Sequence, residues 1–125
     1  MDIFERLEKL ETESKEVGFY WPTSNSAIRQ VLEEIQEVKE VLQQDDVDQD
    51  HLQEELGDLL HAVCSLIFFC DFNVKPTLDK ALDKYEDRFY TMISTAKKQG
   101  VENFSKLSLD QMMSYWKLVK MMKKT

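Results

Sequence analysis

The scarcity of helix breakers constrains this chain more than any other feature of its sequence. Among 125 residues there are only three glycines and two prolines. Apolar residues recur with the 3.6-residue period of amphipathic helices. The pattern predicts an all-α fold, an antiparallel bundle of four to five helices that forms a single domain over residues 1–125.

Local signals predict where these helices begin and end. Asp50 with Gln53, and Ser108 with Gln111, have the spacing of capping boxes, and Thr77 can cap a further helix. The predicted helices cover residues 3–16, 26–44, 50–72 and 77–99, with a fifth running from Ser108 toward the lysine-rich end.

Composition and charge exclude several classes of protein. The net charge of −8 argues against a nucleic-acid polymer as partner. The longest apolar run, residues 59–70, is too short to span a bilayer, and the first residues lack the pattern of a signal peptide. Cys64 and Cys70 are six apart in one predicted helix, which is too far for a disulfide, so we expect two buried, free thiols and a cytoplasmic location.

Two pairs of acids lie at the edges of apolar helix faces. In the second predicted helix, Glu34 lies on the rim of the apolar face and Glu37 is its neighbour at i+3, whereas Glu33 points to the solvated side. In the third, Glu55 and Asp58 precede a segment that is apolar in almost every direction, which indicates a helix enclosed by others.

Antiparallel packing of these two helices could bring the acid pairs together. Carboxylates gathered at an apolar edge repel one another and stay ionised there only beside a cation. Oxygen ligands favour hard ions, Mg²⁺ above all when phosphates supply further ligands. The competing interpretation is a helical interaction module whose acids are merely solvated and whose six methionines form an adaptable apolar surface.

Several motifs occur in a fixed order along the chain. "EEIQE" (33–37) followed by "ELGD" (55–58) resembles the acid signature of the MazG-type nucleoside triphosphate pyrophosphohydrolases, a branch of the all-α NTP pyrophosphatases. "DKYEDRF" (83–89) and "YWKLVK" (115–120) resemble the basic pair and the Trp/Lys pair further along such domains, and Trp21 with Ser26 resembles their W…S element.

The resemblance implies a magnesium-dependent enzyme, with Mn²⁺ as a substitute metal, that cuts (d)NTPs between the α and β phosphates to give NMP and pyrophosphate in nucleotide-pool housecleaning. It also implies a homodimer or a dimer of dimers. The metal ligands would be Glu34, Glu37, Glu55 and Asp58, with Glu37 or Glu33 as the general base. The implied substrate-binding residues are Lys84 and Arg88 on phosphates, Trp116 and Lys120 over the nucleotide, and Trp21 and Asn25 near the base.

The stretch "WPTSNSAIRQ" (21–30) departs from the family pattern, because it lacks the usual Gln-Thr-His run. The base preference is therefore open. A dCTP- or dUTP-type enzyme, or a phosphoribosyl-ATP pyrophosphohydrolase of the same fold, is the alternative within this superfamily.

Overall fold

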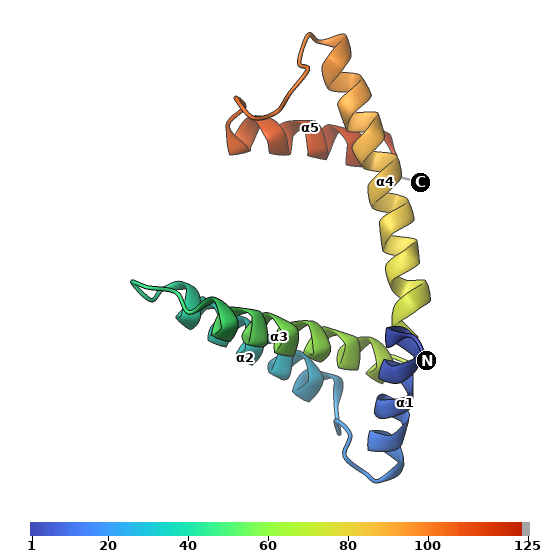
Figure 1. Ribbon diagram of the computed structural model, residues 1–125. Coiled ribbons are helices and arrows are strands. Elements are labelled where there is room, and N and C mark those ends of the chain that lie inside the picture. The colour runs from blue at the N-terminus through green and yellow to red at the C-terminus, as the bar shows by residue number, and fades with distance from the viewer. Residues whose placement is uncertain (124–125) are drawn as a thin grey trace. The chain divides into compact units, whose positions relative to one another are not determined.

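The computed structural model describes residues 1–123 and contains helices but no strand in that range, so the predicted all-α class is confirmed (Figure 1). Residues Met1–Thr77 form one compact unit, and the described residues from Leu78 onward form a second. The helices are α1 (Ile3–Glu16), α2 (Ser24–Leu42), α3 (Gln49–Phe69), α4 (Val74–Lys98) and α5 (Leu109–Met122).

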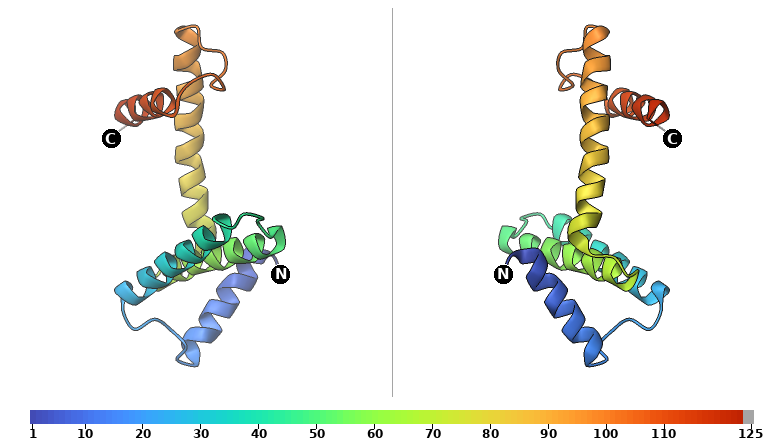
Figure 2. Two further views of the ribbon diagram at one scale, coloured as in Figure 1. Left: turned by 90° about the vertical axis from the view of Figure 1, so that its left-hand side faces the viewer. Right: turned by 90° about the vertical axis from the view of Figure 1, so that its right-hand side faces the viewer.

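The first unit is built on the antiparallel pair α2 and α3. A short turn joins them, and they run side by side in all views (Figures 1 and 2). Small side chains allow this close approach, and the residues buried in the unit are Ala27, Val38, Val41, Ala62 and Cys64. This packed pair carries all four residues of the acid motif, Glu34 and Glu37 on α2 and Glu55 and Asp58 on α3.

Helix α1 is attached to α3 through polar contacts. Ser65 donates a 2.6 Å hydrogen bond to Oε1 of Glu11, and Nε2 of His61 lies 3.1 Å from the same oxygen. The side chain of Glu11 is only 11% exposed. This carboxylate is therefore a fixed contact between the two helices.

The expectation that α3 is enclosed on all sides is wrong for the single chain. Leu56 and Leu60 are 46% and 66% exposed, and the buried residues of α3 are Ala62 and Cys64 alone. The physical reason is that α2 packs closely along one side of α3 and leaves part of its apolar surface uncovered. Cys70 is also exposed, contrary to expectation, although both thiols are free as predicted.

Two of the predicted helix starts are wrong. Asp48, not Asp50, caps α3, because its side chain reaches the backbone N–H groups of Asp50 and His51. Helix α4 begins at Val74, before Thr77, because a proline at position 76 loses nothing in a first turn whose N–H groups have no helical partner. Helix α2 begins at Ser24, two residues before the start expected near Ser26, because Thr23 caps it and forms a capping box with Ser26.

The second unit contains most of α4 and all of α5. The predicted capping box of Ser108 and Gln111 is confirmed at the start of α5. Ala96 and Val119 are completely buried. Aromatic contacts add to this packing, with ring centroids 5.6 Å apart for Tyr85 and Trp116 and 5.5 Å apart for Phe104 and Tyr115.

No single helix within residues 1–123 is long and apolar enough to cross a membrane. Helices α3 and α4 reach that length and hydropathy only when taken together across their break.

The lysine-rich end was expected to continue the fifth helix, and Lys124 and Thr125 lie outside the described residues.

Candidate active site

Three acid side chains meet where α2 packs against α3. One carboxylate oxygen from each of Glu34, Glu37 and Glu55 lies within 4.8 Å of the others. Glu34 and Glu37 are neighbours because three residues separate them on α2. Glu55 faces them because α3 runs antiparallel beside α2. We call Glu34, Glu37 and Glu55 the carboxylate cluster.

Each of the two less exposed members is held by a residue one turn earlier on its own helix. Nε2 of Gln30 donates a 2.6 Å hydrogen bond to Oε1 of Glu34. Nε2 of His51 lies 3.1 Å from Oε1 of Glu55, whose side chain is 15% exposed. The second oxygen of each acid, Oε2, is buried and has no hydrogen-bond partner.

The electrostatics of the cluster disfavour full ionisation. Burial raises the pKa of Glu34, and the negative charges of Glu37 and Asp58 raise it further. The close contact with Glu37 raises the pKa of Glu55, with burial as the next cause. The hydrogen bonds from Gln30 and His51 oppose these shifts without cancelling them. The cluster thus holds more negative charge than its own surroundings compensate.

These residues fit a hard divalent cation. All the donor atoms are carboxylate oxygens, the ligands that Mg²⁺ and Mn²⁺ prefer. Two of those oxygens are buried without a partner, and a buried polar atom in that state is costly unless something binds it. A bound cation would satisfy both oxygens and remove the repulsion.

Two of the predicted acids lie outside the cluster. Asp58 follows Glu55 by one turn and is exposed, and its charge acts on both Glu34 and Glu55 although its oxygens do not join the group of three. Glu33 is exposed on α2, as expected from its place on the solvated side. The structure therefore brings together three of the four predicted metal ligands.

Other predicted site residues of the first unit lie near the start of α2. Trp21 is half-buried in the loop before the helix, and Asn25 is exposed in the first turn.

Sequence reasoning missed Gln30 and His51. The available signal was their spacing, because each precedes a cluster acid by four residues and so shares its helix face.

The remaining predicted residues belong to the second unit. Lys84 is exposed on α4, and Arg88, one turn later, is half-buried with its Nε atom buried and without a hydrogen-bond partner. Trp116 on α5 is half-buried against Tyr85, and Lys120 is exposed. Trp116 thus has a packing role in its own unit.

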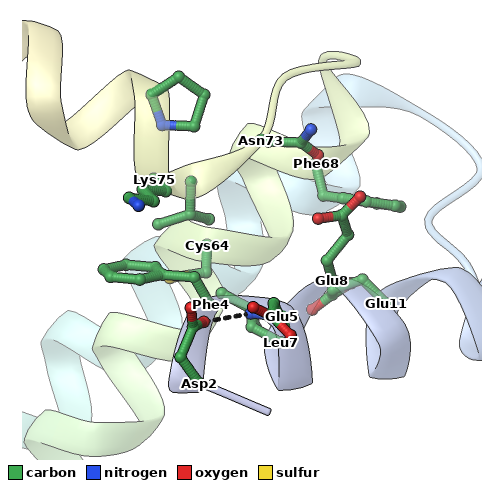
Figure 3. Close-up of a pocket in the computed structure, with 12 residues that line it drawn as sticks. Asp2, Phe4, Glu5, Leu7, Glu8, Glu11, Cys64, Phe68, Asn73 and Lys75 are labelled. Carbon is green, nitrogen blue, oxygen red and sulfur yellow. Dashed lines mark hydrogen bonds between the residues drawn. The ribbon is translucent and has the colours of Figure 1, made fainter.

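A separate pocket of about 240 Å³ lies between α1, α3 and the start of α4 (Figure 3). Figure 3 shows acid side chains of α1 on one side of it and Lys75 on the other. No member of the carboxylate cluster lines this pocket. Its charged lining residues are Asp2, Glu5, Glu8, Glu11 and Lys75.

Comparisons with known proteins point in the same direction as the acid motif. Residues 22–92 match the family of the MazG nucleotide pyrophosphohydrolase domain, a range that contains the whole carboxylate cluster. The chain is 35% identical over 115 residues to the nucleoside triphosphate pyrophosphohydrolase of Escherichia coli K12. It is 29% identical over 112 residues to the nucleoside triphosphate pyrophosphohydrolase/pyrophosphatase MazG of Thermotoga maritima.

These alignments cover 92% and 90% of this chain but 43% and 42% of the two relatives. The chain thus spans less than half the length of the relatives that it matches. The family match covers more than half of the chain and includes the helices that carry the acid motif. This chain therefore belongs to the MazG nucleotide pyrophosphohydrolase family.

Proposed function

We propose that this protein hydrolyses nucleoside triphosphates between the α and β phosphates, releasing NMP and pyrophosphate with the help of Mg²⁺. The observation that carries the proposal is the carboxylate cluster with its two buried, unpartnered oxygens. Family membership and the E. coli and T. maritima relatives, both named as nucleoside triphosphate pyrophosphohydrolases, support it.

In this proposal Glu34, Glu37, Glu55 and Asp58 hold the metal. The bound cation would neutralise phosphate oxygens and lower the pKa of a water molecule. Glu34 and Glu55 offer their buried oxygens, whereas Asp58 would have to turn toward the cluster from its exposed position. The packing of α2 against α3 would hold these acids in place before the substrate binds. Such positioning, together with electrostatic stabilisation, supplies most of the catalysis in phosphoryl transfer.

The proton of the attacking water needs an acceptor. We assign this role to the carboxylate oxygen of Glu37 that would not bind the metal, because Glu37 is the exposed member of the cluster and lies beside Glu34 and Glu55. Glu33 is the alternative base, since it is exposed on the same helix and is not occupied in the cluster. Substitution separates the two assignments. Glu37 is also a proposed metal ligand and Glu33 is not, so only the loss of Glu37 should weaken metal binding.

The proposed substrate contacts come from the resemblance and from the chemistry of the side chains. Lys84 and Arg88 would bind phosphates, because both are cations at i and i+4 of one helix. Trp116 and Lys120 would cover the nucleotide, and Trp21 and Asn25 would contact the base. We place the enzyme in nucleotide-pool housecleaning in the cytoplasm, with a dCTP-, dUTP- or phosphoribosyl-ATP-specific enzyme as the alternative.

We further propose a homodimer as the basic assembly. Apolar side chains recur along α2 and α3 at helical spacing and are between 36% and 66% exposed in the single chain. Exposed apolar side chains at helical spacing are typical of a surface that another protein chain covers. The stripe consists of Ile28, Leu32, Ile35, Leu56, Leu60 and Val63.

The first experiment measures pyrophosphate release from canonical, deaminated and oxidised NTPs, with Mg²⁺ and with a chelator, and identifies the nucleotide product. We expect metal-dependent formation of NMP and its loss in Glu34→Gln, with the ranking of substrates separating the broad from the narrow enzyme. Turnover in the chelator, or full activity in Glu34→Gln, would contradict the proposal.

Light scattering of the wild type and of Leu60→Glu tests the dimer, which the charged variant should dissociate.

A further inference from the structure

We propose that Gln30 and His51 are positioning residues that orient Glu34 and Glu55 for metal binding. This inference rests on the proposed function, because it concerns the same metal site. Neither residue is an acid, and neither belongs to the acid motif.

The two contacts have the same form on two different helices. Gln30 and Glu34 are four residues apart on α2, and His51 and Glu55 are four residues apart on α3. In both, a side-chain nitrogen from the preceding turn meets Oε1 of the acid, at 2.6 Å and 3.1 Å. In both, Oε2 is buried and lacks a hydrogen-bond partner. Glu34 on α2 and Glu55 on α3 are therefore held in the same way, each by a residue of its own helix.

In Glu34 and Glu55 the two carboxylate oxygens therefore have different roles. A hydrogen bond to Oε1 fixes the rotation of the carboxylate and leaves Oε2 as the atom with unused acceptor capacity. Glutamate has three side-chain torsions, so a free carboxylate would lose more entropy on binding a metal. Partners that hold a ligand in this way commonly raise metal affinity by about 10–100-fold.

Gln30 and His51 are both able to donate a hydrogen bond to an ionised carboxylate. An ionised carboxylate only accepts hydrogen bonds, so its partner must donate. The amide nitrogen of Gln30 is always a hydrogen-bond donor. His51 can donate when its Nε2 atom carries the proton, and an ionised Glu55 requires that state for the 3.1 Å contact. His51→Gln would place at this position the same amide donor that Gln30 provides.

The chain contains matched controls for both contacts. Nε2 of Gln36 lies 3.4 Å from Oε1 of Glu40, at the same spacing on α2 but outside the cluster. Nε2 of His61 lies 3.1 Å from Glu11 and belongs to the contact between α1 and α3. Gln36→Met and His61→Leu therefore remove similar side chains without touching the cluster.

The test measures binding of Mn²⁺ alone, without nucleotide, by the loss of the free-ion electron paramagnetic resonance signal. We expect Gln30→Met and His51→Leu each to weaken Mn²⁺ binding about tenfold. His51→Gln should recover most of the loss. Gln36→Met and His61→Leu should bind like the wild type, and circular dichroism establishes that every variant is folded.

The outcomes separate the inference from the proposed function. If the wild type binds Mn²⁺ and Glu55→Gln does not, but Gln30→Met and His51→Leu stay within twofold of the wild type, the positioning role is refuted and the metal site stands. Equal losses in the control variants would also refute it. If the wild type itself binds no Mn²⁺, the proposed function and this inference both fail.

Discussion

The carboxylates of Glu37 on α2 and Glu55 on α3 lie against each other, with oxygens no more than 4.8 Å apart. This contact is the main cause that raises the pKa of Glu55, and burial is the main cause for Glu34. Two acids with raised pKa values at a helix interface make the metal-free protein sensitive to pH.

The metal-free protein should lose stability relative to Glu55→Gln as the pH rises. The folded-state pKa of Glu55 lies above its usual value of 4.5, so the protonated acid is favoured by folding. Its stabilising effect is complete below about pH 4.5 and is lost as the pH rises through the folded-state pKa. Thermal unfolding in a chelator between pH 4 and 7 measures the difference. Glu33→Gln, outside the cluster, is the control, and parallel curves for wild type and Glu55→Gln would contradict the electrostatic account.

Substitution of the two candidate bases should give different results. If Glu37 accepts the proton, Glu37→Gln lowers kcat by about 10²–10⁴-fold, whereas Glu33→Gln stays within about threefold of the wild type. Steady-state turnover and Mn²⁺ affinity are measured on both variants. A large fall in kcat for Glu33→Gln with unchanged Mn²⁺ affinity would transfer the role of base to Glu33.

The proposed phosphate contact of Lys84 predicts an effect on substrate affinity. Lys84→Ala should raise KM for a triphosphate about tenfold, because a charge-assisted hydrogen bond contributes on the order of 1.5 kcal/mol. Lys97→Ala, another exposed lysine of α4, should leave KM unchanged. The kinetics of both variants are compared at saturating Mg²⁺, and equal KM values for Lys84→Ala and wild type would remove Lys84 from the phosphate site.

The contact between Ser65 and Glu11 should contribute measurably to stability. Ser65→Ala removes a 2.6 Å hydrogen bond to the Glu11 carboxylate, which is only 11% exposed. We expect this substitution to lower the free energy of unfolding by about 2 kcal/mol. The control is Lys9→Ala, which breaks an exposed ion pair of 3.8 Å with Glu13. It should change the free energy of unfolding by at most about 0.5 kcal/mol. Urea titrations measure both, and equal effects would mean that α1 is not held by the contact with Ser65.

Periodic and capping signals predicted much of the fold because they act within one helix. The capping box of Ser108 is local and was predicted correctly. The start of α3 was misplaced because Asp48 and Asp50 are both good caps, and only the backbone path decides between them. The acid spacing and the antiparallel pairing of α2 and α3 account for the meeting of Glu34, Glu37 and Glu55, whereas Asp58, the fourth expected ligand, lies outside the group.

The supporting contacts could not be predicted in the same way. Gln30 and His51 look like any polar residues on a helix until the rotamers of Glu34 and Glu55 are known. The exposure of Leu60 on an apolar helix depends on how many other helices cover it, which periodicity does not specify. Side-chain pairing and coverage are properties of the packed unit, so they required the structure.

The two free cysteines should differ sharply in reactivity. Burial, and then the negative charge of Glu11, raise the pKa of the Cys64 thiol, which lowers the fraction of reactive thiolate. Cys70 is exposed at the end of α3. We expect a thiol reagent such as DTNB to modify Cys70 faster than Cys64, because burial both blocks access to the Cys64 thiol and lowers its thiolate fraction. Mass spectrometry of partly labelled protein measures both rates, with urea-unfolded protein as the control in which the rates converge. Equal rates in the folded protein would mean that Cys64 is accessible and that the packing of α1 against α3 opens readily.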